Sequence, residues 1–387
     1  MNAASIDTLV TGATGFIGRW LLIALTSRGR RVAAVVRRAD ERREELKAFV
    51  DARGGDARRL MVIEGDVTQE DLGLAVALPG VRDVYHLAAR MAFGLQHQEA
   101  RETNVEGTVH ALRWAAKAPA LRRFVELGGY RMTHPPARLR YPLTEAMRHD
   151  LYRKHGAYEA SKHEAHVTLH ALAVETGVPL TSVHPCGVIG DSRTGECTQT
   201  DGLGEMAEAL WLGKLRALAG SDRTFVPLVA VDYLADFLAT VVEREETLGA
   251  SLVVLDDATP NLPELVAAMG RHLDVRAPRL VLPLALVRWL PMALTGLHPE
   301  AIGFLSEDRY DVADAAAHAE AMELEMPPWD RVLTRWLDHL VATRFLREPS
   351  VRTSPHGLDL RMRSELASGR YPRAGCCAAA ATSESSG

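Results

Sequence analysis

The feature that most constrains the fold is a glycine-rich turn near the amino terminus. Ile6–Val10 is a short apolar run of the kind found in buried strands, and Phe16–Arg28 has the apolar spacing of a helix. The residues between them, Thr11–Gly18, read TGATGFIG. A strand, a tight turn and a helix therefore follow one another within the first thirty or so residues.

The three glycines of this turn have distinct structural uses. Gly12 permits the sharp turn out of the strand, Gly15 lets the backbone approach a pyrophosphate, and Gly18 lets the helix pack closely on the sheet. A pyrophosphate placed there would be stabilised by the amino end of the helix. The sequence thus predicts a dinucleotide site, and the contacts expected from this turn are Gly12, Thr14, Gly15, Phe16 and Ile17.

Apolar runs continue to alternate with helical segments through the first half of the chain. Because these runs are continuous rather than alternating, they predict a parallel sheet covered on both faces. The predicted fold is a Rossmann-like, doubly wound α/β sheet followed by a smaller, mainly helical C-terminal substrate lobe. The predicted units are a dinucleotide-binding Rossmann domain at 1–187, to which 226–257 returns; a substrate lobe at 188–225 and 258–346; and a flexible tail at 347–387.

Composition excludes several classes of function. The net charge of −5 offers no overall attraction for nucleic acid, and the four cysteines have neither metal-ligand spacing nor a secreted disulfide framework. The most apolar stretch, Val281–Leu297, is broken by prolines and is shorter than the roughly 20 residues that a membrane span needs. We therefore expect a cytoplasmic protein with no signal peptide, membrane span or nucleic-acid partner.

The end of the second predicted strand indicates which dinucleotide is bound. A protein that binds NAD usually places an acidic residue there to bind the ribose hydroxyls. This chain has Arg37 and Arg38 instead, and a guanidinium can hold a 2′-phosphate through paired hydrogen bonds. We predict NADP(H) rather than NAD(H), with Arg37 as the first ligand and Arg38 as the second.

Further contacts are expected where the next two strands end. Asp66 and Val67 follow the third strand, where the carboxylate of Asp66 would reach the adenine amino group. The small residues after the fourth strand would let the backbone lie against the nicotinamide ribose. The contacts predicted there are Leu87, Ala88 and Ala89.

Tyr158 and Lys162 are four residues apart, so they share one face of a helix predicted over Tyr158–Thr176. An ammonium beside a phenol favours the phenolate and lowers the pKa of the tyrosine from about 10. The pair would then transfer a proton to or from a carbonyl. A surface pair with no such role is the alternative, and the glycine-rich turn upstream favours catalysis.

Seven segments together resemble the extended short-chain dehydrogenase/reductase superfamily over roughly residues 6–345. They are TGATGFIG (11–18), GDVT (65–68), HLAA (86–89), NVEGT (104–108), YEASK (158–162), HPCGVIGD (184–191) and VPLVAVDYLADFLA (226–239). Within it, residues 33–38 and 65–74 are similar to thioester-reductase-like members, which reduce carrier- or coenzyme-bound acyl groups.

The resemblance implies roles for particular residues. It makes Tyr158 the acid/base and Lys162 its electrostatic partner, and it places Asn104 near the nicotinamide. It also implies that the segment carrying Pro185 and Val188 passes beside the carboxamide, and that two copies pair through helices at 104–118 and 158–176.

One departure from the family concerns the end of the fifth strand. Relatives usually carry a serine or threonine there, whose hydroxyl polarises the substrate carbonyl, whereas this chain has Gly128 and Gly129. Loss of one such hydrogen bond typically costs 10²–10³ in rate. Tyr130 or Thr133 could substitute, a bulkier substrate could use the room, or hydride chemistry could be weak; we name Thr133 as a catalytic candidate.

No metal site is predicted. His166 and His170 lie four residues apart on the predicted helix, but zinc needs a third ligand and the local sequence offers none.

The sequence therefore predicts an NADPH-dependent reductase of a ketone, aldehyde or acyl thioester with an apolar portion. The apolar residues Trp289, Met292 and Leu294 either line the substrate site or form the core of the lobe. An epimerase or dehydratase that recycles its cofactor, and a non-catalytic NADP-sensing protein, remain as alternatives.

Overall fold

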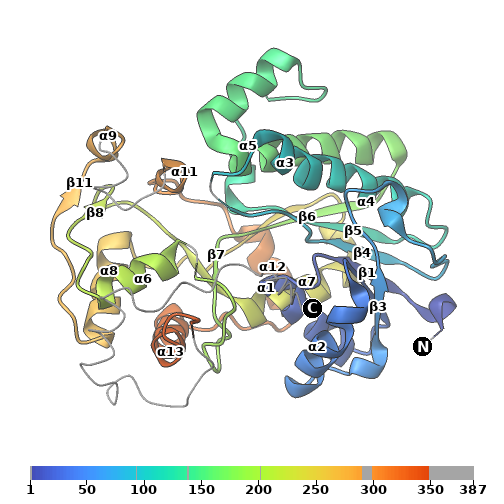
Figure 1. Cartoon of the computed structure of the whole chain (residues 1–387), viewed down its shortest axis with the longest axis horizontal. Coiled ribbons are helices and arrows are strands. Elements are labelled where there is room, and N and C mark those ends of the chain that lie inside the picture. Colours follow the sequence, from blue (N-terminus) through green and yellow to red (C-terminus); the bar gives the residue numbers. More distant parts are fainter. Residues whose placement is uncertain (1, 93, 137–138, 201, 290–298, 348–387) are drawn as a thin grey trace, which may run out of the picture.

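A seven-stranded parallel sheet forms the centre of the molecule (Figure 1). The computed structural model describes residues 2–92, 94–136, 139–200, 202–289 and 299–347. The sheet order is β10-β6-β5-β4-β1-β2-β3. Its strands are β1 (Thr8–Thr11), β2 (Val32–Val36), β3 (Leu60–Glu64), β4 (Asp83–His86), β5 (Arg123–Leu127), β6 (Leu180–Pro185) and β10 (Ser251–Val254).

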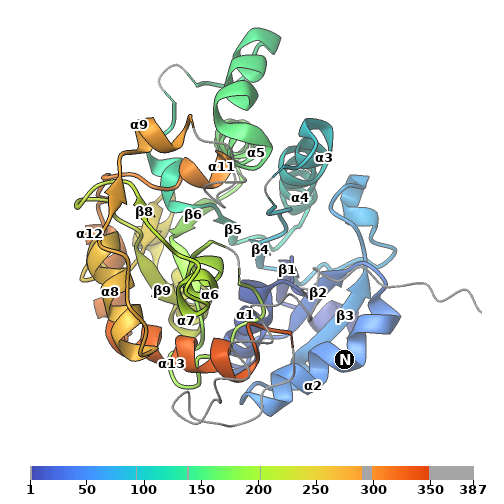
Figure 2. The same cartoon turned by 60° about the vertical axis from the view of Figure 1, so that its left-hand side comes forward.

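Helices cover both faces of this sheet (Figure 2). One face packs against α1 (Phe16–Ser27), α2 (Ala39–Ala52) and α7 (Val231–Thr240), and the other against α4 (Gly107–Ala116) and α5 (Glu145–Thr176). Burial on both faces explains why the strands are continuous apolar runs. The predicted Rossmann-like fold is confirmed.

The order of the strands creates a crevice. The chain moves outward from β1 through β2 to β3 and then returns to β4 on the opposite side of β1. At such a reversal the helices that follow neighbouring strands lie on opposite faces, which opens a gap at the carboxyl ends of the strands. The glycine-rich turn after β1 lies at this point.

The C-terminal region gathers to one side of the sheet and is mainly helical (Figure 1). Its elements are β7 (Gly187–Ile189), α6 (Leu203–Trp211), β8 (Leu218–Ala219), β9 (Leu228–Ala230), α8 (Leu262–His272), β11 (Val281–Leu282), α9 (Leu284–Val287), α11 (Pro299–Ile302), α12 (Ala313–Ala321) and α13 (Trp329–Ala342). The remaining helical turns are η1 (Ala3–Ser5), η2 (Ala57–Arg59), η3 (Glu70–Gly73), α3 (His97–Arg101), η4 (Glu102–Glu106), η5 (Tyr130–Thr133), η6 (Val241–Glu243) and η7 (Glu245–Thr247).

Two predicted helices have different bounds in the structure. The segment 104–118 divides into the π-helical turn η4 and then α4. The helix predicted over Tyr158–Thr176 is the second part of α5, which begins at Glu145 and is interrupted at Gly156, where φ is 75° and ψ is 175°. This backbone conformation is nearly restricted to glycine, so the helix that carries Tyr158 starts afresh after it.

Parts of two sequence predictions lie outside the described residues. They are the tail from 348 onward and the apolar residues Met292 and Leu294. Trp289 is described and is 88% exposed, so it belongs neither to the core nor to a cavity wall. Among the described residues, no helix is both long enough and apolar enough to cross a bilayer.

Candidate active site

A cavity of about 390 Å³ opens at the carboxyl ends of β1, β4, β5 and β6. It contains Tyr158 and Lys162 together with the glycine-rich turn, although these segments are about 140 residues apart in the sequence. The other predicted site residues that line it are Gly12, Gly15, Phe16, Ile17, Leu87, Ala89, Pro185 and Val188.

The glycine-rich turn is packed so tightly that side chains are excluded. Gly12 has a φ of 72°, and a β-carbon there would lie 2.6 Å from the backbone of both Leu87 and Ala88. A β-carbon on Gly18 would lie 2.2 Å from the carbonyl oxygen of Gly12. The turn therefore presents bare backbone, with Gly15 at the amino end of α1, as a pyrophosphate requires. The residues present fit a dinucleotide.

The two arginines after β2 differ in their surroundings. Arg38 has a left-handed backbone, and its guanidinium lies 3.3 Å from the carboxylate of Glu41. Arg37 is exposed, and its guanidinium contacts no charged or hydrogen-bonding partner among the described residues.

An acidic residue also lies at this position, although β2 itself has none. Glu64, from the end of β3, accepts hydrogen bonds from the backbone N–H groups of Arg38 (3.0 Å) and Ala39 (2.6 Å). It caps α2, so its two oxygens are already engaged. Sequence reasoning missed it because the residue comes from the neighbouring strand.

Four other predicted contacts do not line the cavity. Asp66 accepts hydrogen bonds from the backbone N–H and the hydroxyl of Thr68, both at 2.9 Å. Val67 packs against α4, and Thr14 and Ala88 contribute backbone beside the lining residues.

Asn104 is engaged elsewhere. It is buried, and its amide bonds the backbone N–H (2.7 Å) and carbonyl (3.2 Å) of Arg90 and the hydroxyl of Ser161 (2.8 Å). The side chain thus ties the loop after β4 to α5. The position near the nicotinamide that the family resemblance implies for Asn104 stays a prediction.

Lys162 donates a hydrogen bond to the carbonyl oxygen of Leu127, at 2.9 Å. This bond fixes the ammonium against the end of β5. Tyr158 lies one helical turn earlier on α5, with its ring stacked on Phe304 at a centroid distance of 6.5 Å. The two side chains thus enter the cavity from one helix face, as the spacing predicts.

The predicted effect of Lys162 on the tyrosine is wrong for this structure. Burial raises the pKa of Tyr158 to about 12, and the negative charge of Glu159 adds to the rise. Burial also lowers the pKa of Lys162, and the charge of Glu126 partly offsets that fall. The phenol is protonated at neutral pH because desolvation disfavours the phenolate.

The two glycines after β5 are not equivalent. A β-carbon on Gly128 would lie 2.3 Å from Nδ1 of His184, whereas one on Gly129 would meet nothing within 4 Å. Of the two positions where the family resemblance implies a hydroxyl, only Gly129 faces open space. Thr133 does not line the cavity, because its hydroxyl donates to the carbonyl of Tyr130 at 2.7 Å.

Residues that sequence reasoning did not single out complete the cavity, and they come from the segments after β4 and β5, from α5 and from the C-terminal region. Most are apolar, and one buried ion pair joins Arg131 to Glu159 at 2.9 Å. An apolar stripe on a helix predicts only burial, so the sequence held no signal that separates a cavity wall from a core. The main additional lining residues are Met91, Met132, Leu203, Phe304 and Trp336.

Comparison with known proteins agrees with this geometry. Residues 10–238 match the sequence model of an NAD-binding family described as male sterility protein. One component of the linear gramicidin synthase of Brevibacillus parabrevis is 27% identical over 278 residues, which are 67% of this chain and 5% of that protein. The chain thus spans a small part of that relative.

Two further relatives are similar over most of their length. Dihydroflavonol 4-reductase of Hordeum vulgare is 27% identical over 297 residues, covering 73% of this chain and 78% of that enzyme. The terminal R domain from the myxalamid PKS-NRPS biosynthetic pathway has the same fold, with a TM-score of 0.70, 22% identity, and coverage of 90% of this chain and 94% of that domain. The chain therefore belongs to the NAD-binding family described as male sterility protein, among the extended short-chain dehydrogenase/reductases.

Proposed function

We propose that the protein is an NADPH-dependent reductase of a ketone, aldehyde or acyl thioester whose remainder is apolar. The observation that carries this proposal is that Tyr158 and Lys162 line the same cavity as the glycine-rich turn. An acid, a cation and a dinucleotide cradle that share one cavity provide the parts that carbonyl reduction needs.

Tyr158 acts as the proton donor. When bound, a reduced nicotinamide supplies a hydride to the carbonyl carbon, and the carbonyl oxygen gains negative charge. A phenol whose pKa is about 12 remains protonated at neutral pH, so it has a proton to give.

Lys162 provides a fixed positive charge that stabilises the negative charge developing on the carbonyl oxygen. Its bond to Leu127 holds the positive charge against the end of β5, in the cavity that Tyr158 also lines. A fixed cation near the oxygen that becomes negative is worth more in a water-poor cavity than in water, because it needs no reorganisation during the reaction.

The choice of NADPH over NADH is based on Arg37. Its exposed guanidinium contacts no acidic partner among the described residues, whereas both oxygens of Glu64 bind backbone N–H groups of α2. A 2′-phosphate would therefore meet an available cation and an acid whose charge is partly offset by the helix end.

The substrate preference follows from the walls of the cavity. Met91, Met132, Leu203 and Phe304 are apolar, and the open space beside Gly129 adds room next to the catalytic tyrosine. An acyl chain would bury its surface there. The thioester option also agrees with the similarity to the gramicidin synthase and to the R domain.

The test is a panel of aldehydes, ketones and acyl thioesters, monitored by NADPH absorbance with wild-type protein and with Tyr158→Phe. We expect turnover of at least one apolar substrate by the wild type and a loss of at least about 10²-fold in the variant. NADPH affinity, measured by calorimetry, should be unchanged.

Other outcomes would replace this function. Nicotinamide that survives purification without net NADPH consumption would indicate an epimerase or dehydratase. NADPH binding without any turnover, and with cellular activity unaffected by Tyr158→Phe, would indicate a sensor.

A further inference from the structure

A second cluster of chemically active side chains lies on the same helix as the catalytic pair. Tyr158, Lys162, His166 and His170 follow one another at intervals of four residues on α5, so they lie on one face. The first two enter the cavity. The last two lie further along the helix, over strands β5 and β6, and take no part in the proposed reaction.

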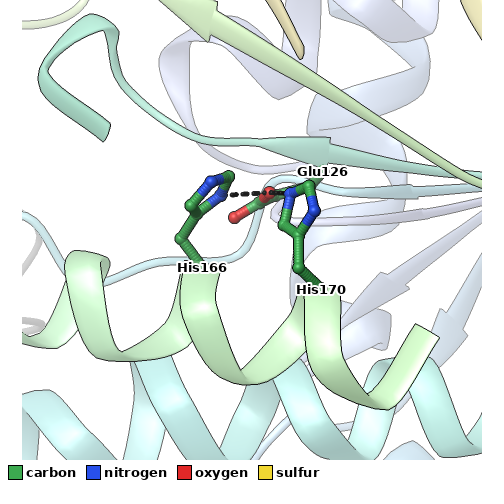
Figure 3. Close-up of side chains that lie close together, drawn as sticks. All are labelled: Glu126, His166 and His170. Atoms are coloured by element: carbon green, nitrogen blue, oxygen red, sulfur yellow. Dashed lines mark hydrogen bonds and ion pairs between the residues drawn. The ribbon is translucent and has the colours of Figure 1, made fainter. Parts of the chain in front are cut away.

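Glu126 of β5 points at these two histidines (Figure 3). Its carboxylate is 3% exposed, and Oε2 lies 2.9 Å from Nδ1 of His166 and 3.9 Å from Nε2 of His170. The three ligand atoms all lie within 4.8 Å of one another. The sequence offered two of these donors, and the third comes from a strand 40 residues away.

We propose that Glu126, His166 and His170 form a binding site for a divalent transition-metal ion of the zinc type. Two imidazole nitrogens and one carboxylate oxygen are a donor set that zinc uses widely, usually with a fourth ligand from water or another side chain. Water would supply that ligand here, and the hydroxyl of Ser182, 2.7 Å from Glu126 and 3.0 Å from His170, lies beside two of the ligands as a hydrogen-bonding partner.

The geometry needs only a small adjustment to hold the ion. Donors around a tetrahedral zinc with bonds of about 2.0–2.1 Å lie roughly 3.3 Å apart. His166 and Glu126, at 2.9 Å, would have to separate by about 0.4 Å, and His170, at 3.9 Å from Glu126, would have to approach it by about 0.6 Å. The side chain of His170 is 39% exposed, so solvent rather than packed atoms borders much of the ring and a shift of this size is permitted.

The competing arrangement is a hydrogen-bonded network without metal, in which His166 and Ser182 alone satisfy the buried carboxylate. The two differ in what they predict for the helix. A bound ion would join α5 to β5 by coordinate bonds and would stabilise the folded chain in proportion to the ion concentration. The network would respond to no metal.

The experiment uses the full chain after treatment with a chelator. Cobalt(II), the spectroscopic probe for a zinc site, is titrated in and followed by its visible absorption, and zinc(II) binding is measured by calorimetry. We expect one ion per chain, and a loss of affinity of at least about tenfold for His170→Asn and His166→Asn.

The matched control is His272→Asn. His272 lies 2.6 Å from Asp338, which makes a histidine–carboxylate pair without a third donor within the described chain. This variant should bind cobalt as the wild type does. Saturating zinc should raise the melting temperature of the wild type and of His272→Asn but not that of His170→Asn.

The readouts keep this proposal separate from the catalytic one. NADPH binding should persist in all three variants, which shows that they are folded, and metal binding is measured without substrate. No stoichiometric uptake by the wild type, or equal uptake by His170→Asn, would overturn the site whatever the enzyme assays show. Glu126 is too deeply buried to serve as the main variant.

Discussion

Gly128 lies against the imidazole ring of His184, so that a β-carbon at position 128 would come within 2.3 Å of its Nδ1 atom. The ring is held from its other side by a 2.9 Å hydrogen bond between Nε2 and the hydroxyl of Ser251. It therefore has little freedom to move away. Position 128 is a glycine because the buried histidine occupies the space, whereas position 129 has no such neighbour.

This difference predicts opposite results for two serine substitutions. Gly129→Ser adds a hydroxyl at one of the two positions where the family resemblance implies one, and we expect it to raise kcat on a small carbonyl substrate by about tenfold or more, since one such donor is typically worth 10²–10³. Gly128→Ser should instead lower the free energy of unfolding by about 1–3 kcal/mol through overpacking. Steady-state kinetics and urea denaturation measure the two effects. If Gly128→Ser and Gly129→Ser change kcat and the free energy of unfolding equally, the two positions do not differ as the structure indicates.

Cofactor choice should depend on Arg37. Replacement by alanine removes the cation proposed for the 2′-phosphate, so the Kd for NADPH should rise about 10- to 100-fold while that for NADH stays the same. Arg38→Ala is the control, and its effect should be smaller because its guanidinium already pairs with Glu41. Calorimetric titration of both dinucleotides checks this. If Arg37→Ala lost affinity for NADH as well as for NADPH, Arg37 would not be the ligand of the 2′-phosphate.

Gly156 sets where the helical segment that carries Tyr158 begins. An alanine there would have to adopt φ of 75° and ψ of 175°, and its β-carbon would meet the side chain of Glu300 at 2.4 Å. We expect Gly156→Ala to lower the free energy of unfolding by about 1–3 kcal/mol and to reduce turnover, because Tyr158 is two residues away.

The control for that substitution is Gly177→Ala at the carboxyl end of the same helix. Gly177 also has a positive φ, 70°, but a β-carbon there meets nothing within 4 Å. Gly177→Ala should lower the free energy of unfolding by about 1 kcal/mol and leave turnover normal. If Gly156→Ala and Gly177→Ala have the same turnover, the helix break at Gly156 has no part in positioning Tyr158.

Stability should fall in acid through His86. This histidine is buried between the hydroxyls of Thr11 (2.9 Å) and Thr108 (3.0 Å), and burial lowers its pKa to about 3. Its pKa in the unfolded chain is about 6.5. Between these values the unfolded state binds one more proton, so the free energy of unfolding decreases as the pH drops from about 6.5 towards 3.

The slope from this single group is at most about 1.4 kcal/mol per pH unit. Urea denaturation of the wild type and of His86→Gln at pH 6, 5 and 4 measures the contribution of His86 to the pH dependence of stability. The variant should be less stable at neutral pH and should lose less stability on acidification. An identical pH slope for both proteins would show that His86 becomes protonated without unfolding.

The sequence by itself determined the features that depend on neighbours along the chain. The strand, turn and helix around Gly12 follow from local spacing, and the shared face of Tyr158 and Lys162 follows from the pitch of a helix. The apolar strand runs similarly predicted a parallel sheet buried on both faces.

Only the tertiary structure decided what depends on segments that are distant in sequence. The contact of His184 with Gly128, the engagement of Asn104 with Arg90 and the approach of Glu126 to two histidines each join different elements. The pKa of Tyr158 belongs to the same class, because desolvation is set by everything that encloses the phenol rather than by the lysine four residues away. Local spacing fixes which side chains share a face, whereas packing between elements fixes what that face meets.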